Sequence, residues 1–590
     1  MLDFRNINTL YTSIISETLF RLGLTTAIIC PGSRSAPLTI AFASHAGIET
    51  IPVLDERSAA FFALGIAKKT NKPVALICTS GTAVANFFPA IIEAKESKIP
   101  LLILSADRPP ELRHCHAGQT IDQVKIFGNY PNWYAELVTP SLVVKELEAL
   151  RNTIIHAYKT TLLPIPGVVH LNIPFREPLV PINQPETELL RTIINPQTFF
   201  TNCQPFFLPN QRSSYPEVVQ QWQDYLQNNI KNNTKGIIIA GLAQSRDPQE
   251  AAEYCQAIAI LSQALGFPIL GEGLSPIRNY ASLNPYLIST YDILLRHQEL
   301  AAELTPEIVI QIGELPTSKQ LRQWLEKTAV PRWIITPYHD NYDPLHGASQ
   351  HLLTSLQELV HNLEILPPKQ PNSYLELWLN LEQETRKNID ITMEAIAELR
   401  EPKIAWLTAQ ILPLKTSIFI ANSMPIRDVE SFWKPSDRQT QIYFSRGANG
   451  IDGTLSTALG IAHNHQSSIL LTGDLALLHD TNGCLISKNL RGHLTILLIN
   501  NNGGGIFENL PISKFEPPFE EYFATPQLVD FAKLAETYGL EYQLITSWLQ
   551  LQNLLQILPT QGVRVLEIPT DRQQDAQWRQ NISEILLSKG

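Results

Sequence analysis

Cysteine and methionine are scarce in this sequence, and the few cysteines have no paired spacing. The chain has 590 residues but only 6 cysteines and 3 methionines, and no two cysteines form a CxxC pair. A disulfide framework needs densely paired cysteines, and a structural zinc site needs closely spaced Cys and His ligands. The sequence therefore argues against both and favours a reducing compartment.

Long hydrophobic runs and an excess of basic residues are also missing. The strongest apolar runs, such as TAIIC and LTILLIN, are strand-sized, whereas a membrane span needs roughly 20 residues. The N-terminus lacks the basic-then-apolar layout of a secretory signal and the Arg/Ser bias of a transit peptide. With 45 Lys and Arg against 56 Asp and Glu, the charge has the wrong sign for coating nucleic acid or anionic lipid. We expect a cytoplasmic protein with no membrane span and no nucleic-acid partner.

The sequence does contain enough apolar material for several folded domains. Hydrophobic residues make up 44% and charged residues 17%, which excludes a wholly disordered chain. At roughly 150 residues per domain, the length suggests three or four domains. Short apolar runs alternate with helix-like stretches, which is typical of a parallel sheet with crossover helices. The expected fold class is α/β, with doubly wound parallel sheets.

Two Pro-rich stretches divide this α/β pattern into three domains, which we predict at 1–190, 200–365 and 375–590. The first linker lies near residues 175–215, and the second is LEILPPKQPNS. The expected strands of the first domain are TAIIC, TIPVLD, PVALICTS and PLLILSAD. Those of the second are KGIIIAG, FPIL, EIVIQIG and RWIIT. Those of the third are TSIFIANSM, QIYFSRG, SSILLTGD, LTILLIN and VRVLEIP.

Two strand ends in the third domain carry the most specific chemical signal. SSILLTGD ends at Gly473 and Asp474, and LTILLIN runs into Asn501 and a turn that contains Gly503 and Gly505. Asp474 and Asn501 are separated by 27 positions, enough for one helix and one strand, which makes the two strand ends neighbours in a parallel sheet. Carboxylate, amide and backbone oxygens suit Mg²⁺ or Ca²⁺, and glycines let a diphosphate approach the main chain. The alternative is a helix-capping Asp and an Asn-Gly turn.

This pair of motifs resembles the GD…NN signature of thiamine diphosphate (ThDP)-dependent enzymes. Further segments resemble one branch, the 2-succinyl-5-enolpyruvyl-6-hydroxy-3-cyclohexene-1-carboxylate synthase (MenD) family. They are CPGSRSAPLT, LDERSAAFFALGIAK, TSGTAVAN, SADRPPEL, SRGANGIDG and NNNGGGIFENLP. The outer two domains match well, and the middle one matches only by length and position. The resemblance implies a pyrimidine-binding (PYR), a central and a pyrophosphate-binding (PP) domain, in that order.

The resemblance also implies a cofactor site for ThDP with Mg²⁺ or Mn²⁺. It places the cofactor-activating glutamate at Glu56 in LDERS, where a carboxyl group against the aminopyrimidine N1′ promotes loss of the thiazolium C2 proton. The alternative is that Asp55 caps a helix and Glu56 only favours its first turn. The implied metal ligands are Asp474, Asn501 and Gly503. The implied cofactor contacts are Glu56, Ser423, Ile451, Gly473, Asp474, Asn501, Gly503 and Gly505.

The reactants of this family, 2-oxoglutarate and isochorismate, are both dicarboxylates. Guanidinium groups bind carboxylates in a bidentate manner, which suits arginines at strand ends. The implied substrate-binding residues are Ser33, Arg34, Arg108, Gln119, Lys319, Asn422, Arg427, Arg446, Ile506 and Phe507. Ion pairs with Asp107 or Asp428 are the alternative for one or two of the arginines, and core packing is the alternative for the apolar residues.

Two departures from the family pattern matter. Leu475 follows GD where the general ThDP pattern has GDG, and TSKQ stands where the family often has TGKR. Gln320 therefore leaves the role of Lys319 open.

The implied reaction is decarboxylation of 2-oxoglutarate and addition of the resulting four-carbon unit to isochorismate, in menaquinone or phylloquinone biosynthesis. The resemblance further implies a homodimer or homotetramer with active sites at the subunit interface. Two other functions stay open. A different carboligating ThDP enzyme would prefer pyruvate, and the number of arginines argues against this alternative. A non-catalytic phosphate sensor is disfavoured by Glu56, and no GxxxxGK loop is present.

Overall fold

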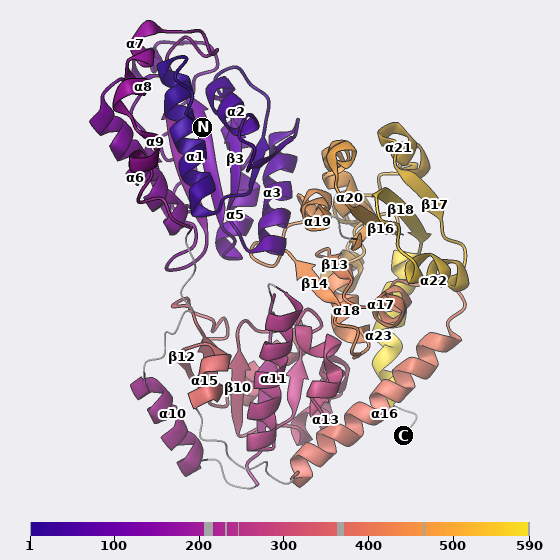
Figure 1. Ribbon diagram of the computed structural model, residues 1–590. Coiled ribbons are helices and arrows are strands. Elements are labelled where there is room, and N and C mark those ends of the chain that lie inside the picture. The colour runs from indigo at the N-terminus through magenta and orange to yellow at the C-terminus, as the bar shows by residue number, and fades with distance from the viewer. Residues whose placement is uncertain are drawn as a thin grey trace. The chain divides into compact units, whose positions relative to one another are not determined.

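The computed structural model describes residues 2–205, 216–229, 233–245, 247–362, 371–463 and 467–587. Its strands form three six-stranded parallel sheets with helices around them, which confirms the predicted α/β class (Figure 1). The chain folds into two compact units. Unit 1 comprises 1–209, 445–466 and 476–493, and unit 2 comprises 210–444, 467–475 and 494–590.

The first sheet belongs to unit 1 and has the strand order β2-β1-β3-β4-β6-β5. Its strands are β1 (Thr26–Ile29), β2 (Glu49–Pro52), β3 (Val74–Cys78), β4 (Leu101–Asp107), β5 (Trp133–Glu136) and β6 (Val168–Pro174). Its helices include α1 (Ile7–Leu22), α2 (Ala36–Ala43), α3 (Glu56–Thr70), α4 (Thr82–Ala85), α5 (Phe88–Glu96) and α6 (Val144–Thr160). The four expected strand sequences form β1 to β4.

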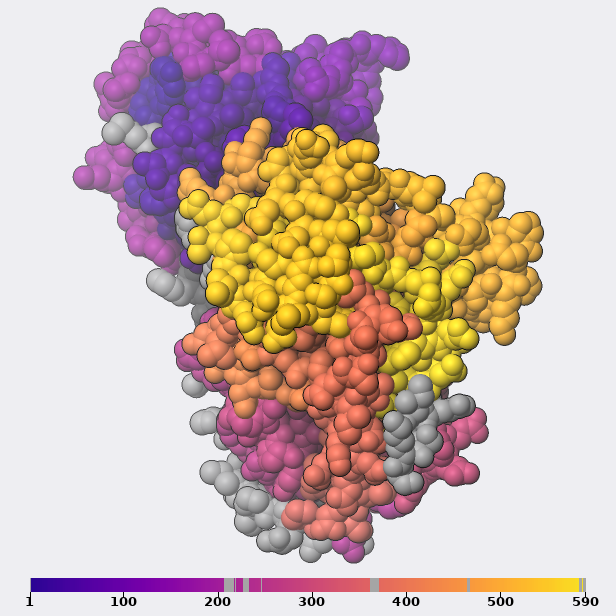
Figure 2. All heavy atoms as spheres, turned by 90° about the vertical axis from the view of Figure 1, so that its right-hand side faces the viewer, coloured from indigo at the N-terminus to yellow at the C-terminus, as the bar shows by residue number. Residues whose placement is uncertain are grey.

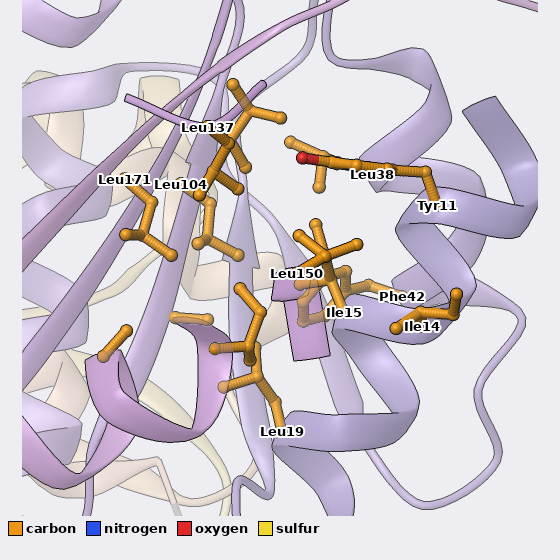
Figure 3. Packing of buried hydrophobic residues seen from close by; sticks show 14 of the residues in the cluster. Tyr11, Ile14, Ile15, Leu19, Leu38, Phe42, Leu104, Leu137, Leu150 and Leu171 are labelled. Atoms are coloured by element: carbon orange, nitrogen blue, oxygen red, sulfur yellow. The ribbon is translucent and has the colours of Figure 1, made fainter. Parts of the chain in front are cut away.

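Helix α1 shows how the apolar pattern builds the core of unit 1. Its buried apolar residues recur three and four positions apart, as in one stripe of an amphipathic helix, and they include Ile14, Ile15 and Leu19. Figure 3 shows them facing Phe42 of α2 and Leu104 of β4, which belong to the same buried cluster. Asn6 caps the start of the helix by accepting a hydrogen bond from the Thr9 N–H. Burial of this stripe fixes α1 against the sheet.

The opposite face of the first sheet carries α3, whose neighbour comes from far along the chain. That neighbour, α19 (Thr454–Ala462), packs along α3 in the same unit. A Cβ at Gly65 of α3 would lie 2.0 Å from the Thr457 carbonyl oxygen, and one at Gly460 of α19 would lie 2.2 Å from the Phe62 carbonyl oxygen. Only glycine permits the two helix backbones to approach this closely.

Unit 2 contains the other two sheets. The middle sheet has the order β12-β11-β10-β7-β8-β9, and its strands are β7 (Gly236–Ala240), β8 (Ile269–Gly271), β9 (Leu287–Ile288), β10 (Ile308–Ile312), β11 (Arg332–Thr336) and β12 (Ser349–Leu353). Its helices are α10 (Pro216–Asn229), α11 (Pro248–Leu265), α12 (Tyr291–Leu294), α13 (Gln298–Glu303), α14 (Lys319–Thr328) and α15 (Leu356–Asn362). The four expected strands form β7, β8, β10 and β11.

The third sheet has the order β14-β13-β15-β16-β18-β17. Its strands are β13 (Ser417–Ile420), β14 (Gln441–Phe444), β15 (Ser467–Gly473), β16 (His493–Asn500), β17 (Glu541–Leu544) and β18 (Gly562–Pro569). The helices near it are α16 (Ser373–Ala395), α17 (Glu401–Ile411), α18 (Met424–Phe432), α20 (Asp474–His479), α21 (Phe531–Tyr538), α22 (Trp548–Gln556) and α23 (Arg572–Leu587). Asn388 of α16 donates a hydrogen bond of 2.9 Å to the Leu586 carbonyl of α23. Figure 2 shows α16 in coral beside the yellow C-terminal part of this unit.

The first predicted linker is partly wrong. Residues within its expected range of 175–215 form three short helices, α7 (Pro185–Glu188), α8 (Leu190–Ile193) and α9 (Pro196–Phe199). Leu190, Phe199 and Phe200 lie in the buried cluster of unit 1, because large apolar side chains are more stable in a core than in water. Residues 206–215 of this linker and 363–370 of the second lie outside the described residues. The domain boundaries stay a prediction.

None of the described helices is both long and apolar enough to span a membrane.

Candidate functional site

The turn after β1 places Ser33 and Arg34 beside the end of β3. The Arg34 N–H donates to the Thr79 Oγ1 at 3.3 Å, and its Nη1 donates to the Phe175 carbonyl at 2.9 Å. Arg34 is buried, and its Nε has no hydrogen-bond partner among the described residues. Burial lowers the pKa of Arg34, and the nearby charge of Arg108 lowers it further. The two guanidinium groups therefore lie close enough to repel one another.

Arg108 and Gln119 meet at Ser80, in the turn after β3. The Arg108 Nη1 donates to the Ser80 Oγ at 2.5 Å, and the Gln119 Nε2 donates to the Ser80 carbonyl at 3.0 Å. The Ser80 Oγ in turn donates to the Gln119 carbonyl at 3.1 Å. The structure thus gathers Arg34, Arg108 and Gln119 at the carboxyl ends of β1, β3 and β4, as predicted for ligand sites in parallel sheets.

Asp107 is not the ion-pair partner of the Arg108 side chain. Its carboxylate binds Arg113 Nη2 at 2.9 Å and accepts hydrogen bonds from the Asn172 side chain at 2.8 Å and from the Arg108 N–H at 2.7 Å. Burial raises the pKa of Asp107, which these donors oppose. Asp107 and Asn172 hold the Arg108 turn in place. Sequence reasoning missed Asn172, because nothing in its local sequence distinguishes it from other strand residues.

Glu56 is the first residue of α3, and Asp55 caps that helix. The Asp55 Oδ1 accepts from the Ser58 N–H at 2.9 Å, and its Oδ2 accepts from the Asn482 side chain at 2.8 Å. The capping alternative is therefore correct for Asp55, and it leaves the half-buried carboxyl of Glu56 without a structural role in the cap. Burial raises the thiol pKa values of Cys30 and Cys78, and the charge of Glu56 raises them further. Glu56 thus lies near the ends of β1 and β3.

The turn that carries Arg446 and Ile451 is bound to a buried carboxylate that sequence reasoning missed. Glu93 of α5 accepts from the Gly447 N–H at 3.2 Å and from the Ala448 N–H at 2.7 Å. Glu93 itself is buried and also accepts from the Ser97 hydroxyl at 2.6 Å. The only sequence signal is a glutamate on the apolar face of a helix. Glu93 therefore anchors the turn to α5.

Replacing Glu93 by Ala should lower the free energy of unfolding by about 2–4 kcal/mol, because two backbone N–H groups lose a buried acceptor. Urea unfolding measures the change. The matched control is Glu96→Ala, on the same helix but exposed, where we expect a change of less than about 0.5 kcal/mol. An equal loss in both variants would show that Glu93 does not anchor the turn.

In unit 2, Asp474 and Gly503 meet at the ends of the neighbouring strands β15 and β16. The Asp474 Oδ2 accepts from the Gly503 N–H at 2.8 Å, and its Oδ1 accepts from the Leu475 N–H at 2.7 Å. Burial raises the pKa of Asp474 to about 6. Gly503 has a φ of +135°, and a Cβ there would lie 2.4 Å from the Ala524 carbonyl oxygen, so no other residue fits. The predicted adjacency of the two strand ends is confirmed.

Among the described residues, only one of the two polar side-chain atoms of Asn501 has a hydrogen-bond partner. Its Nδ2 donates to the Glu401 Oε1 at 2.6 Å, whereas its buried Oδ1 has no hydrogen-bond partner among the described residues. The position where Gly473 would carry a Cβ is open space. A carboxylate, an unpaired amide oxygen and room against the main chain fit a hard cation with a diphosphate. The described residues contain no group of three or more His, Cys, Asp or Glu that could hold a metal ion.

Asn422, Ser423 and Arg427 cluster at the end of β13. Ser423 has a φ of +75°, which non-glycine residues rarely adopt and which recurs at functional sites. The Arg427 Nη1 donates to the Ser423 carbonyl at 2.6 Å. Asp428, the alternative partner for Arg427, is held by Arg579 at 2.6 Å. Asn422 is buried beside them.

The remaining predicted residues lie in the turn after β16 and at the start of α14. Ile506 and Phe507 are half-buried in the turn after β16, and Phe507 packs edge-on against Phe523 with ring centroids 5.7 Å apart. Gly505 follows Gly503 in the same turn. Lys319 is exposed at the start of α14, and no contact described for the structure connects it with the other predicted residues.

Three models of thiamine pyrophosphate enzyme domains match this chain. Residues 11–126 match the thiamine pyrophosphate enzyme N-terminal TPP binding domain, 195–420 match the middle domain, and 428–568 match the C-terminal TPP binding domain. A 2-succinyl-5-enolpyruvyl-6-hydroxy-3-cyclohexene-1-carboxylate synthase from Trichodesmium erythraeum is 60% identical, with 98% of each chain covered. The same-named protein from Gloeothece citriformis is 58% identical, with 100% of each chain covered. The chain belongs to the 2-succinyl-5-enolpyruvyl-6-hydroxy-3-cyclohexene-1-carboxylate synthase family.

Solved structures show that this synthase family member has the fold of ThDP enzymes. The benzoylformate decarboxylase from Polynucleobacter necessarius matches with a TM-score of 0.70 at 15% identity, covering 97% of this chain and 99% of that one. The 4-hydroxybenzoylformate decarboxylase from Rhodococcus jostii matches with a TM-score of 0.67 at 15% identity, covering 95% and 99%. At this identity the likeness concerns the fold alone.

Proposed function

We propose that this chain joins a four-carbon unit, formed by decarboxylation of 2-oxoglutarate, to isochorismate, using ThDP with Mg²⁺ or Mn²⁺. The product is the compound after which its relatives are named, an intermediate of menaquinone or phylloquinone biosynthesis. The observation that carries the proposal is the pair of strand ends at Asp474 and Asn501. It combines a buried carboxylate with an amide oxygen that has no partner among the described residues.

The residues of this pair would hold the cofactor through its diphosphate. Asp474, the Asn501 Oδ1 and the Gly503 carbonyl offer hard oxygen ligands for Mg²⁺, and the diphosphate would complete the shell. Gly473 and Gly505 leave the main chain accessible to phosphate oxygens. When bound, ThDP supplies a carbon nucleophile that also accepts the electron pair released by decarboxylation.

Glu56 has a different task, which is to hold a proton at the aminopyrimidine N1′. A half-buried carboxyl at the start of α3, beside the strand ends of the first sheet, suits this role. Ile451 would contact the cofactor rings, and Ser423 would contact the diphosphate. General acid–base groups of this kind contribute roughly 10²- to 10⁴-fold to a rate.

The arginines would bind the two acids without exchanging protons. Arg34 and Arg108 lie close together, and the Nε of Arg34 has no hydrogen-bond acceptor among the described residues. Two guanidinium groups beside Gln119 suit a dicarboxylate, since each carboxylate can accept two hydrogen bonds from one fork. We assign Ser33, Asn422, Arg427, Arg446, Ile506 and Phe507 to substrate binding as well, and leave Lys319 outside this group.

We further propose a homodimer or homotetramer with active sites at the subunit interface. Light scattering coupled to size-exclusion chromatography distinguishes two copies from four, and a monomer that turns over at the normal rate would overturn this part of the proposal.

Product analysis tests the proposed reaction directly. Purified protein incubated with 2-oxoglutarate, isochorismate, ThDP and Mg²⁺ should form the succinylated cyclohexene carboxylate, detected by mass spectrometry, and release carbon dioxide. Omitting ThDP or replacing isochorismate by buffer is the control and should give no such product. Absence of the product from the complete mixture would refute the reaction, and faster turnover of pyruvate would indicate a different carboligase.

A further inference from the structure

A fully buried glutamate connects the predicted metal ligand Asn501 to the C-terminal helix. Glu401, the first residue of α17, has no exposed surface. Its Oε1 accepts from the Asn501 Nδ2 at 2.6 Å, and its Oε2 accepts from the Arg579 Nη2 of α23 at 2.6 Å. Both contacts are charge-assisted and short, as in strong hydrogen bonds.

Further contacts hold Arg579 and the backbone of Glu401 in place. Arg579 also binds Asp428 of α18, through its Nε at 2.8 Å and its Nη2 at 2.6 Å. The backbone N–H of Glu401 donates to Asp575 of α23 at 3.2 Å, and Arg400 binds the same carboxylate at 3.2 Å. A buried carboxyl group needs hydrogen-bond donors that replace its lost hydration. Arg579 and Asn501 supply these donors to Glu401.

The contact with Glu401 decides which way the Asn501 amide faces. The two ends of an asparagine amide have the same shape, and one is a donor while the other is an acceptor. Because both oxygens of Glu401 accept hydrogen bonds, one from Asn501 and one from Arg579, the NH₂ end of Asn501 faces Glu401. The Oδ1 then faces away from it, and this is the atom without a hydrogen-bond partner among the described residues.

We propose that Glu401 is a positioning residue for the metal site, which turns the Oδ1 of Asn501 into an available ligand, and that Arg579 holds Glu401 in this role. The inference rests on the proposed ThDP and metal site. Outer partners of metal ligands commonly fix the orientation of those ligands, and their loss costs about 10- to 100-fold in metal affinity.

The neighbouring residue provides a matched control. Asn500 donates through its Nδ2 to the Glu567 Oε1 at 2.7 Å, and Glu567 also accepts from the Tyr542 hydroxyl at 2.7 Å. This contact is of the same kind as the one between Asn501 and Glu401. Asn500 is the last residue of β16 and directly precedes Asn501, so the two side chains point to opposite faces. Asn500 is not among the predicted ligands, so Glu567→Gln weakens an Asn–Glu contact without changing the partner of a predicted ligand.

Binding of Mn²⁺ in the presence of ThDP, followed by electron paramagnetic resonance, measures the role of Glu401 without reference to turnover. Glu401→Gln should weaken Mn²⁺ binding by about 10- to 100-fold, and Glu567→Gln should leave it unchanged. Normal binding by Glu401→Gln would overturn the inference and leave the metal site in place. Failure of the unaltered protein to bind Mn²⁺ with ThDP would instead contradict the proposed function.

Reversing the hydrogen bond separates positioning from a merely structural role. In the double variant Asn501→Asp with Glu401→Gln, the glutamine amide donates to the new aspartate, and one carboxylate oxygen stays available to the metal. We expect this variant to bind Mn²⁺ more tightly than Glu401→Gln alone, a coupling that double-mutant cycles detect. Equally weak Mn²⁺ binding by the double variant and by Glu401→Gln would show that Glu401 only holds α23, and it would overturn the inference.

Circular dichroism will show whether Glu401→Gln folds. If it does not fold, Arg579→Lys is the variant that tests the inference. Lysine keeps the positive charge but cannot bind both carboxylates with a planar fork. Weakened Mn²⁺ binding by a folded Arg579→Lys variant supports the chain of contacts from α23 to Asn501, and unchanged binding contradicts it.

Discussion

Replacing Glu56 by Gln should reduce turnover with both substrates by about 10²- to 10⁴-fold, the range typical of a lost acid–base group. Glutamine has the shape of glutamate but cannot hold and release a proton at the aminopyrimidine N1′. Because Glu56 is not among the predicted metal ligands, affinity for ThDP and Mg²⁺ should fall far less than turnover. Steady-state rates and calorimetric titration with ThDP measure the two quantities separately.

The neighbouring Asp55 gives the control for this substitution. Asp55 caps α3 through the Ser58 N–H, and asparagine caps helices about as well as aspartate. Asp55→Asn should therefore keep near-normal turnover, although it removes a carboxylate one position away. Ordinary turnover by Glu56→Gln would show that the assigned activation mechanism is wrong.

Replacing Asp474 by Ala should abolish metal-dependent ThDP binding, with a loss of affinity greater than about 100-fold, since loss of an outer partner of a metal ligand alone costs about 10- to 100-fold. The substitution removes the charged ligand and also the acceptor for the Gly503 and Leu475 N–H groups. The turn that should face the diphosphate would lose its anchor at the same time. Calorimetric titration with ThDP at fixed Mg²⁺ measures the loss.

Asp343 is a matched control for Asp474. It likewise accepts from two backbone N–H groups, those of Leu345 at 3.1 Å and Gly347 at 3.0 Å, but it lies in the loop between β11 and β12 of the middle sheet. Asp343→Ala should lower stability and leave ThDP affinity unchanged. Unchanged affinity in Asp474→Ala would remove the metal assignment, and an equal loss in both variants would indicate general destabilisation.

Strands that contain a continuous apolar run could be predicted from the sequence, and strands without one could not. PLLILSAD and LTILLIN correspond to β4 and β16, whose residues are almost all buried, because continuous apolar runs are typical of the interior of a parallel sheet. By contrast, β5 reads WYAE and is half-exposed, and β9 has only two residues. Neither gives a hydrophobic pattern long enough to recognise.

The burial of residues in the first predicted linker could not be predicted from the sequence either. The stretch near residues 175–215 is rich in Pro, which is typical of a connection, but Leu190 and Phe199 within it are buried in unit 1. Whether such apolar residues are buried depends on a surface that the rest of the chain provides.

The sequence by itself determined which polar residues lie at the strand ends. Asp474, Asn501 and Arg108 each follow a strand directly, and Arg34 lies in the turn after β1. Because parallel strands end at one edge of a sheet, local order is enough to bring such residues together within each unit. The tertiary structure alone decided what holds them. Glu93 meets Ala448 across 355 positions, and Glu401 meets Asn501 across 100 and Arg579 across 178. These partners are buried carboxyl groups whose hydrogen-bond donors come from distant parts of the chain, and no local pattern in the sequence indicates where those donors lie.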